Sequence, residues 1–221
     1  MRKLSNLLED VATLDGAIQA VRTLRSIKRC GTFYTAQPQN VAEHSYFTAL
    51  FAMLLCRQCC YPLIWISFER DVIAAALFHD LGEAVTGDVR WQIKQSNSTL
   101  ATLEDSVKNT MLDTLGMREM PQAVAHPDVA LVVDAADMLE FVMTGLDELQ
   151  LTGRLSLDFA NGVEALNGLL LSLVARYGEN HSPFGAPIVR YAYKMLATPI
   201  QPLQSQEIVQ RCLKEAEPWL K

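Results

Sequence analysis

The sequence has few cysteines, and the five that it has are an odd number in a chain of 221 residues. A small fold held together by a framework of disulfide bonds is therefore not expected. Cys56 and Cys59 have the spacing of a redox or zinc pair, but they lie in an amphipathic segment with no second such pair nearby. We expect them to be small buried hydrophobic residues.

Long apolar runs and dense basic blocks are also absent. The runs ALFAMLLC and GLLLSLVA are far too short to cross a bilayer, and no apolar signal-peptide region follows the N-terminal charges. With a net charge of −6 and no cluster of Lys or Arg, the chain is not expected to bind a nucleic-acid polymer. We expect a cytoplasmic protein that contacts no membrane. A small phosphorylated ligand fits this charge, because one or two basic side chains can hold it.

Signals of β-structure are nearly absent, since no alternating pattern persists and no Asn-Gly or Asp-Gly hairpin occurs. The dominant period is helical and predicts an all-α fold in a single domain over residues 1–221. Asn40 and Glu43 have the spacing of a capping box at the start of one helix. The expected helices cover residues 5–27 with a break at Leu14–Gly16, 41–60, 68–80, 98–115, 128–151, 156–177, 187–197 and 204–219. A short turn is expected from Glu83, and a loop or partly ordered segment over 88–97.

Histidines inside apolar helices mark a candidate site. His44 lies in the helix expected over 41–60, and His79 ends the helix expected over 68–80, directly before Asp80. A buried neutral imidazole needs partners for both ring nitrogens, and a metal ion can be one of them. Consecutive helical residues point about 100° apart. We therefore expect the last turn to relax so that His79 and Asp80 can reach one ion.

A fourth metal ligand is expected from the helix over 128–151. Asp134 and Asp137 interrupt its apolar run, where a carboxylate without a partner is costly, and the spacing alone favours neither. Two imidazoles and two carboxylates suit a divalent ion such as Mn²⁺, Co²⁺, Fe²⁺, Ni²⁺ or Zn²⁺. The set contains no thiolate, which argues against a closed structural zinc site.

The remaining charged residues have simpler interpretations. The acidic residues at 104–105, 147–148 and 214–216 are expected on solvated helix faces. His126 and His181 lie in segments rich in Pro and Gly, and we expect both at the surface.

Four segments together resemble a known family. His44, His79-Asp80 and Asp137 resemble the H…HD…D signature of the HD-domain metal-dependent phosphohydrolases. The closer resemblance is to the YfbR-like 5′-deoxynucleotidases, which have an Arg fifteen residues before the first His, as Arg29 is here. It covers roughly residues 16–150, and we expect the helices of 156–221 to pack on this core or to form an oligomer interface. The matching segments are NVAEHS (Asn40–Ser45), HDLGEAVTGD (His79–Asp88) and AADML (Ala135–Leu139).

The resemblance implies a role for each matching residue. His44, His79, Asp80 and Asp137 would bind one divalent transition metal per subunit. Glu83 would act on the water or the leaving group, Arg29 would bind the phosphate, Asp88 would contact the deoxyribose, and Lys94 would lie near the phosphate. The family also implies a homodimer or a larger homo-oligomer.

The sequence departs from the family at the expected substrate pocket. Cys30 stands where the family usually has Trp, and VRWQIK (Val89–Lys94) replaces LPTPVK, which places Arg90 and Trp91 at pocket positions. The family implies hydrolysis of 2′-deoxynucleoside 5′-monophosphates. An additional Arg would also suit a longer phosphate chain. The alternative is therefore a deoxynucleoside triphosphate triphosphohydrolase that releases tripolyphosphate, as the related phage dATP triphosphohydrolases do. A third hypothesis is a non-catalytic nucleotide sensor.

Overall fold

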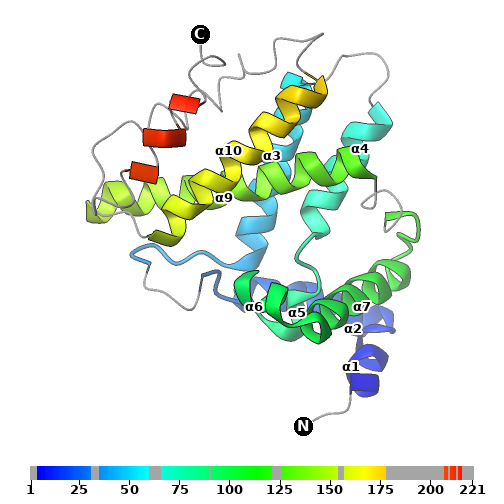
Figure 1. Cartoon of the computed structure of the whole chain (residues 1–221). Coiled ribbons are helices and arrows are strands. Elements are labelled where there is room, and N and C mark those ends of the chain that lie inside the picture. Colours follow the sequence, from blue (N-terminus) through cyan, green and yellow to red (C-terminus); the bar gives the residue numbers. More distant parts are fainter. Residues whose placement is uncertain are drawn as a thin grey trace. The chain divides into compact units, whose positions relative to one another are not determined.

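The computed structural model describes residues 4–30, 35–59, 66–89, 91–120, 126–153 and 157–177, and residues 207, 208, 210–212, 214 and 215. These residues form helices, turns and loops without a β-strand, which confirms the all-α prediction (Figure 1). The elements are α1 (Leu4–Val11), α2 (Leu14–Thr23), the 3-10 helix η1 (Leu24–Ser26), α3 (Val41–Cys59), α4 (Ile66–Phe78), α5 (Glu83–Thr86), α6 (Trp91–Ser96), α7 (Ser98–Thr114), α9 (Pro127–Thr152) and α10 (Leu157–Tyr177).

Two compact units make up the chain. The first consists of residues Met1–Tyr46 and Leu77–Val124, and the second consists of Phe47–Ala76 and Ala125–Lys221. The expectation of a single domain stays a prediction. None of the helices in the described part of the chain is both long enough and apolar enough to cross a membrane.

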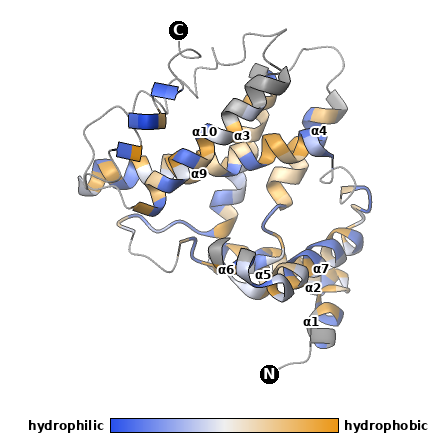
Figure 2. Cartoon of the chain, in the orientation of Figure 1, coloured by the Kyte–Doolittle hydropathy of each residue, from blue (hydrophilic) through white to orange (hydrophobic). Residues whose placement is uncertain are grey.

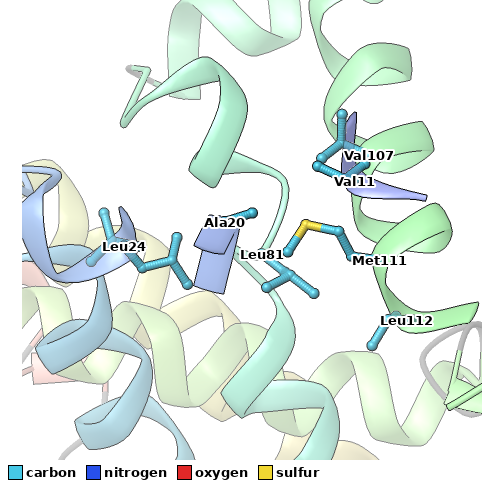
Figure 3. Close-up of a cluster of buried hydrophobic side chains, with 8 residues drawn as sticks. Val11, Ala20, Leu24, Leu81, Val107, Met111 and Leu112 are labelled. Atoms are coloured by element: carbon cyan, nitrogen blue, oxygen red, sulfur yellow. The ribbon is translucent and has the colours of Figure 1, made fainter. Parts of the chain in front are cut away.

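The first unit has an apolar core built from α1, α2, η1, α7, the start of α3 and the turn before α5 (Figure 3). On α7, Val107, Met111 and Leu112 follow helical spacing and are at most 1 % exposed. Leu81, which lies between Asp80 and Glu83 in the HD segment, turns inward and is 2 % exposed. Burial of this leucine fixes the turn that carries His79 and Asp80. The cluster comprises Val11, Ala20, Leu24, Val41, Leu81, Val107, Met111 and Leu112.

The capping signals in the first unit are confirmed. The Asn40 side chain accepts a hydrogen bond from the Glu43 backbone N–H (3.0 Å), and a Glu43 carboxylate oxygen accepts one from the Asn40 N–H (3.2 Å). A break does separate α1 from α2, but it lies at Ala12 and Thr13, directly before the expected Leu14–Gly16, and the Thr13 hydroxyl accepts from the Gly16 N–H (3.1 Å). Gly16 is required there because a Cβ would lie 1.8 Å from the Asp10 carbonyl oxygen.

Two sequence predictions, one on each side of the HD turn, differ from the structure. The helix before the turn ends at Phe78, two residues earlier than expected. The segment over 88–97, expected to be a loop or only partly ordered, contains the helix α6. The α6 sequence WQIKQS has no Pro or Gly to oppose a helix, and α6 packs on α7. Asn97 then separates the two helices, since its side chain accepts from the Leu100 N–H (3.2 Å) and caps α7.

In the second unit, the long helices α9 and α10 pack closely against each other. They run antiparallel, since Gly145 meets Phe159 and Phe141 meets Gly162. Phe141 and Phe159 meet with ring centroids 4.6 Å apart, and a Cβ on Gly145 would lie 2.7 Å from the Phe159 ring. Apolar colours predominate along α9 (Figure 2). Glu148 is 7 % exposed, so the expectation of a solvated face at 147–148 was wrong for this residue.

Further predictions concern two histidines and the two C-terminal helices. His126 is exposed, as expected, and its ring nitrogen accepts from the Asp128 N–H (3.2 Å) at the start of α9. His181 and the helix expected over 187–197 lie outside the described residues. In the helix expected over 204–219, the residues that the structure describes are helical.

Candidate active site

A short backbone pairing brings Arg29 and Cys30 to the start of α3. Arg29 N–H donates to the Gln39 carbonyl (2.8 Å) and Val41 N–H donates to the Ile27 carbonyl (3.0 Å). Cys30 has a φ of 56°, in the left-handed region that side chains with a Cβ rarely adopt. Its N–H donates to the Asp88 carboxylate (2.6 Å), and this bond compensates for the strained backbone.

His44, His79 and Asp80 converge in the first unit. His44 on α3 is fully buried, and His79 and Asp80 lie in the turn after α4. The two Nε2 atoms are 3.2 Å apart, and the Asp80 Oδ2 lies 3.5 Å from His44 Nε2 and 3.2 Å from His79 Nε2. The expected convergence of His79 and Asp80 therefore occurs, but in a turn outside the helix.

These three side chains fit a divalent metal ion. Ligand atoms bound at about 2.0–2.2 Å are separated by about 2.9–3.5 Å in octahedral or tetrahedral geometry. The observed separations of 3.2 to 3.5 Å fall in that range. Both imidazoles offer a ring nitrogen to such an ion.

Asp80 keeps its charge in this setting. Burial acts to raise the pKa of Asp80, but His79, Arg29 and His44 act against it and hold that pKa well below its usual range. One contributor is Arg29, whose Nη1 lies 3.4 Å from Asp80 Oδ2. An ionised carboxylate beside two imidazoles is the state that a metal ligand requires.

Glu83 begins α5 and is almost completely buried, with 1 % of its surface exposed. Its Oε1 accepts from Lys94 Nζ (2.6 Å), and its Oε2 has no hydrogen-bond partner in the described part of the chain. Burial and the Asp80 charge raise the pKa of Glu83 to about 7, with Lys94 opposing them. Such a group can exchange a proton near neutral pH. Because α4 ends before His79, the four-residue spacing from His79 to Glu83 does not lie on one helix face.

Arg29 and Asp88 form a second pair beside this group. Arg29 Nη1 lies 3.3 Å from Asp88 Oδ1, so one guanidinium nitrogen contacts both Asp80 and Asp88. Gly87, with a φ of 74°, lets the chain turn between α5 and Asp88. The predicted phosphate-binding Arg and the predicted sugar-binding Asp thus lie together.

Lys94 on α6 has a different environment from the one expected of a phosphate-binding residue. Its ammonium lies between two carboxylates, 2.6 Å from Glu83 Oε1 and 3.0 Å from Glu104 Oε2. Glu104 on α7 was expected to be solvated, and that expectation was wrong because its side chain is 14 % exposed and paired. The helical spacing of Leu103 and Val107 could have shown that Glu104 adjoins the inward face of α7.

For four further predicted site residues, the structure gives only the helix or the exposure, or does not describe the residue. Arg90 lies outside the described residues, and Trp91 begins α6 without a described side chain. On α9, Asp134 is exposed and Asp137 is partly buried.

Comparison with known proteins identifies the class of enzyme. The family model for 5′-deoxynucleotidase YfbR-like proteins matches residues 17–163. The molecule is thus a deoxynucleotide phosphohydrolase. The chain belongs to the YfbR-like 5′-deoxynucleotidase family, as the resemblance in its sequence predicted.

Solved structures with similarity to the chain were also found. One is the cyanophage S-2L HD phosphohydrolase DatZ bound to dA and one catalytic Zn²⁺ ion, with 19 % identity, 90 % of this chain and 94 % of that chain covered, and a TM-score of 0.49. Another is a structural-genomics crystal structure with 21 % identity, 92 % and 95 % covered, and a TM-score of 0.45. No curated protein matches the chain.

Proposed function

We propose that this protein hydrolyses 2′-deoxynucleoside 5′-monophosphates to a deoxynucleoside and inorganic phosphate. The observation that carries the proposal is the convergence of His44, His79 and Asp80 within 3.2 to 3.5 Å. Arg29 contacts the same Asp80, so a phosphate-binding cation lies beside the ligands. Family membership supports a deoxynucleotide as the substrate.

His44, His79, Asp80 and Asp137 would hold one divalent transition metal ion per subunit. Asp137 is preferred to Asp134 as the fourth ligand because Asp134 is exposed and Asp137 is partly buried. A bound ion of this kind lowers the pKa of water and withdraws charge from a phosphate oxygen.

Arg29 and Glu83 carry the remaining steps. Arg29 has five N–H donors, and its planar fork matches two phosphate oxygens while charge develops on them. Glu83 Oε2, which has no hydrogen-bond partner among the described residues, accepts a proton from the attacking water as the water oxygen bonds to phosphorus. As the bond from phosphorus to the 5′-oxygen breaks, Glu83 returns that proton to the 5′-oxygen.

The substrate pocket would use the residues near the same turn. Asp88 contacts the deoxyribose, and its bonds to Arg29 and the Cys30 N–H set its orientation. Cys30, Arg90 and Trp91 would form the sugar and base side. Lys94 would lie near the phosphate through its contact with Glu83, which binds its ammonium together with Glu104. We also propose that the enzyme acts as a homodimer or a larger homo-oligomer.

The test is a panel of deoxynucleoside and ribonucleoside mono-, di- and triphosphates, each with Mn²⁺, Co²⁺, Zn²⁺, Ni²⁺ or Fe²⁺, with products resolved by chromatography. Release of phosphate from deoxynucleoside monophosphates is expected. Hydrolysis of ribonucleotides alone would contradict the proposal.

The second candidate is a triphosphohydrolase. Its support is the replacement of the family's LPTPVK by VRWQIK, which adds Arg90 next to the phosphate-binding segment. In the same panel it predicts tripolyphosphate from dATP and no phosphate from dAMP.

A further inference from the structure

The Lys94 ammonium connects Glu83 to a second, partly buried acid, Glu104. Lys94 Nζ lies 2.6 Å from Glu83 Oε1 and 3.0 Å from Glu104 Oε2, and the Lys94 side chain is 21 % exposed. Burial acts to lower the pKa of Lys94, but the Glu83, Asp80 and Glu104 carboxylates raise it above its ordinary value. The bridge therefore contains a permanent cation held by two acids.

Glu104 also holds the far end of α5. Its Oε1 accepts a hydrogen bond from the Thr86 hydroxyl (2.8 Å), and Thr86 is the last residue of α5. Glu83, the first residue of the same helix, is tied to Glu104 through Lys94. The residue before Glu83, Gly82, lies directly against α7, because a Cβ on it would lie 2.5 Å from the Glu104 carbonyl oxygen. Both ends of α5 are thus fastened at one position of α7.

We propose that Glu104 is a positioning residue, which holds the Lys94 ammonium against Glu83 and fastens Thr86, so that Glu83 Oε2 stays aimed at the reacting water. The proposal rests on the proposed function, in which Glu83 moves the proton. Lys94 is a flexible cation with three N–H donors, and a single acceptor would leave it free to rotate. Glu104 removes that freedom because it adds a second fixed acceptor.

The kinetic test compares Glu104→Ala with Glu104→Gln in the metal-loaded enzyme, with the best monophosphate substrate. Glu104→Ala is expected to lower kcat about tenfold because a small misplacement of the proton-transfer group is costly. KM should stay within about twofold, because no contact with substrate is lost. Glu104→Gln should keep at least half of kcat, because its amide oxygen can accept from Lys94 and its N–H can donate to Thr86.

The matched control is Asp105→Ala, which removes an acid one residue away on α7. Asp105 is 66 % exposed and pairs with Lys108, outside this network. We expect its kcat to be unchanged. An equal loss of kcat in Asp105→Ala and Glu104→Ala would show a general charge effect and overturn the proposal.

A double-mutant cycle tests whether Glu104 acts through Lys94. Adding Glu104→Ala to Lys94→Met should lower kcat by no more than about threefold, the loss expected from releasing Thr86, because the link to Glu83 is already broken. A full additional tenfold loss would contradict the proposal. If Glu104→Ala does not fold, Thr86→Val removes one anchor of Glu104 and keeps its charge. It should lower kcat about threefold, and an unchanged kcat would also overturn the proposal.

A readout that needs no substrate separates this proposal from the proposed function. In protein labelled with nitrogen-15 lysine, the held Lys94 ammonium should give a slowly exchanging NMR signal. The signal should disappear in Glu104→Ala and persist in Glu104→Gln and Asp105→Ala. Its persistence in Glu104→Ala would refute the positioning role. Inactivity on every deoxynucleotide with the expected NMR result would refute only the proposed reaction.

Discussion

At the scale of single residues, Glu83 combines near-complete burial with one carboxylate oxygen that has no hydrogen-bond partner among the described residues. An unsatisfied buried oxygen costs free energy of folding, so its retention at this position supports a role in chemistry. The replacement Glu83→Gln keeps the shape of the side chain and removes its ability to exchange a proton.

The first prediction concerns this replacement. Glu83→Gln should lower kcat by about 10²- to 10⁴-fold, the usual contribution of a general acid or base. It should leave the metal content unchanged, because Glu83 is not among the proposed ligands. Steady-state kinetics and metal analysis of the purified variant test this, and a kcat near that of the wild type would disprove the assignment.

The second prediction concerns pH and stability of the metal-free protein. The folded-state pKa of Glu83, about 7, lies above its ordinary value of 4.5, so the folded protein binds a proton that the unfolded chain releases. The stabilisation from this proton is complete below pH 4.5 and is lost as the pH rises through 7. Relative to Glu83→Gln, the wild-type Tm should fall by several degrees between pH 5 and pH 8. A constant difference between the two melting curves would contradict the raised pKa.

At the scale of elements, the position of α5 on α7 depends on Gly82. A Cβ there would lie 2.5 Å from the Glu104 carbonyl oxygen and 2.9 Å from its carbonyl carbon. Because both atoms belong to the backbone of α7, the helices would have to move apart.

The third prediction follows from this contact. Gly82→Ala should lower the free energy of unfolding by about 1–3 kcal/mol, as overpacking commonly does, and it should lower kcat because Glu83 adjoins it. The control is Gly168→Ala on α10, where a Cβ meets nothing within 4 Å. That change should be neutral or stabilise by up to about 1 kcal/mol. Chemical denaturation followed by circular dichroism measures both, and equal effects would contradict the close contact.

At the scale of the whole molecule, metal binding is expected to stabilise the folded protein. An ion that binds only the folded state adds about 2.7 kcal/mol when its concentration is one hundred times Kd. Removal of the metal with a chelator should therefore lower Tm and abolish hydrolysis, and restoring the metal should recover both.

The fourth prediction uses this stabilisation to identify the α9 ligand. Asp137→Asn should raise the apparent Kd for the metal at least about tenfold, as loss of a ligand does. The rise in Tm at a given metal concentration should therefore be smaller than in the wild type. Asp134→Asn is the matched control three residues earlier, on the exposed side of α9, and should leave the rise unchanged. The opposite result would assign the ligand to Asp134.

Light scattering during size-exclusion chromatography would test the expected oligomer.

The sequence by itself determined the helical class, the capping box at Asn40 and Glu43, the pair His79-Asp80 and the family, because these depend on local periodicity and on residue types at short spacings. It placed the end of α4 two residues late and missed α6, because helix ends depend on small differences in local free energy. It also took Glu104 for a solvated residue.

Only the tertiary structure decided how these residues meet. Lys94 and Glu104 are ten residues apart on different helices, and no local pattern states that α6 and α7 pack so that both reach Glu83. The same holds for Arg29, whose side chain meets Asp80 and Asp88 more than fifty residues away. Burial then changed the chemistry, because removing Glu83 from water beside the Asp80 charge raised its pKa to about 7.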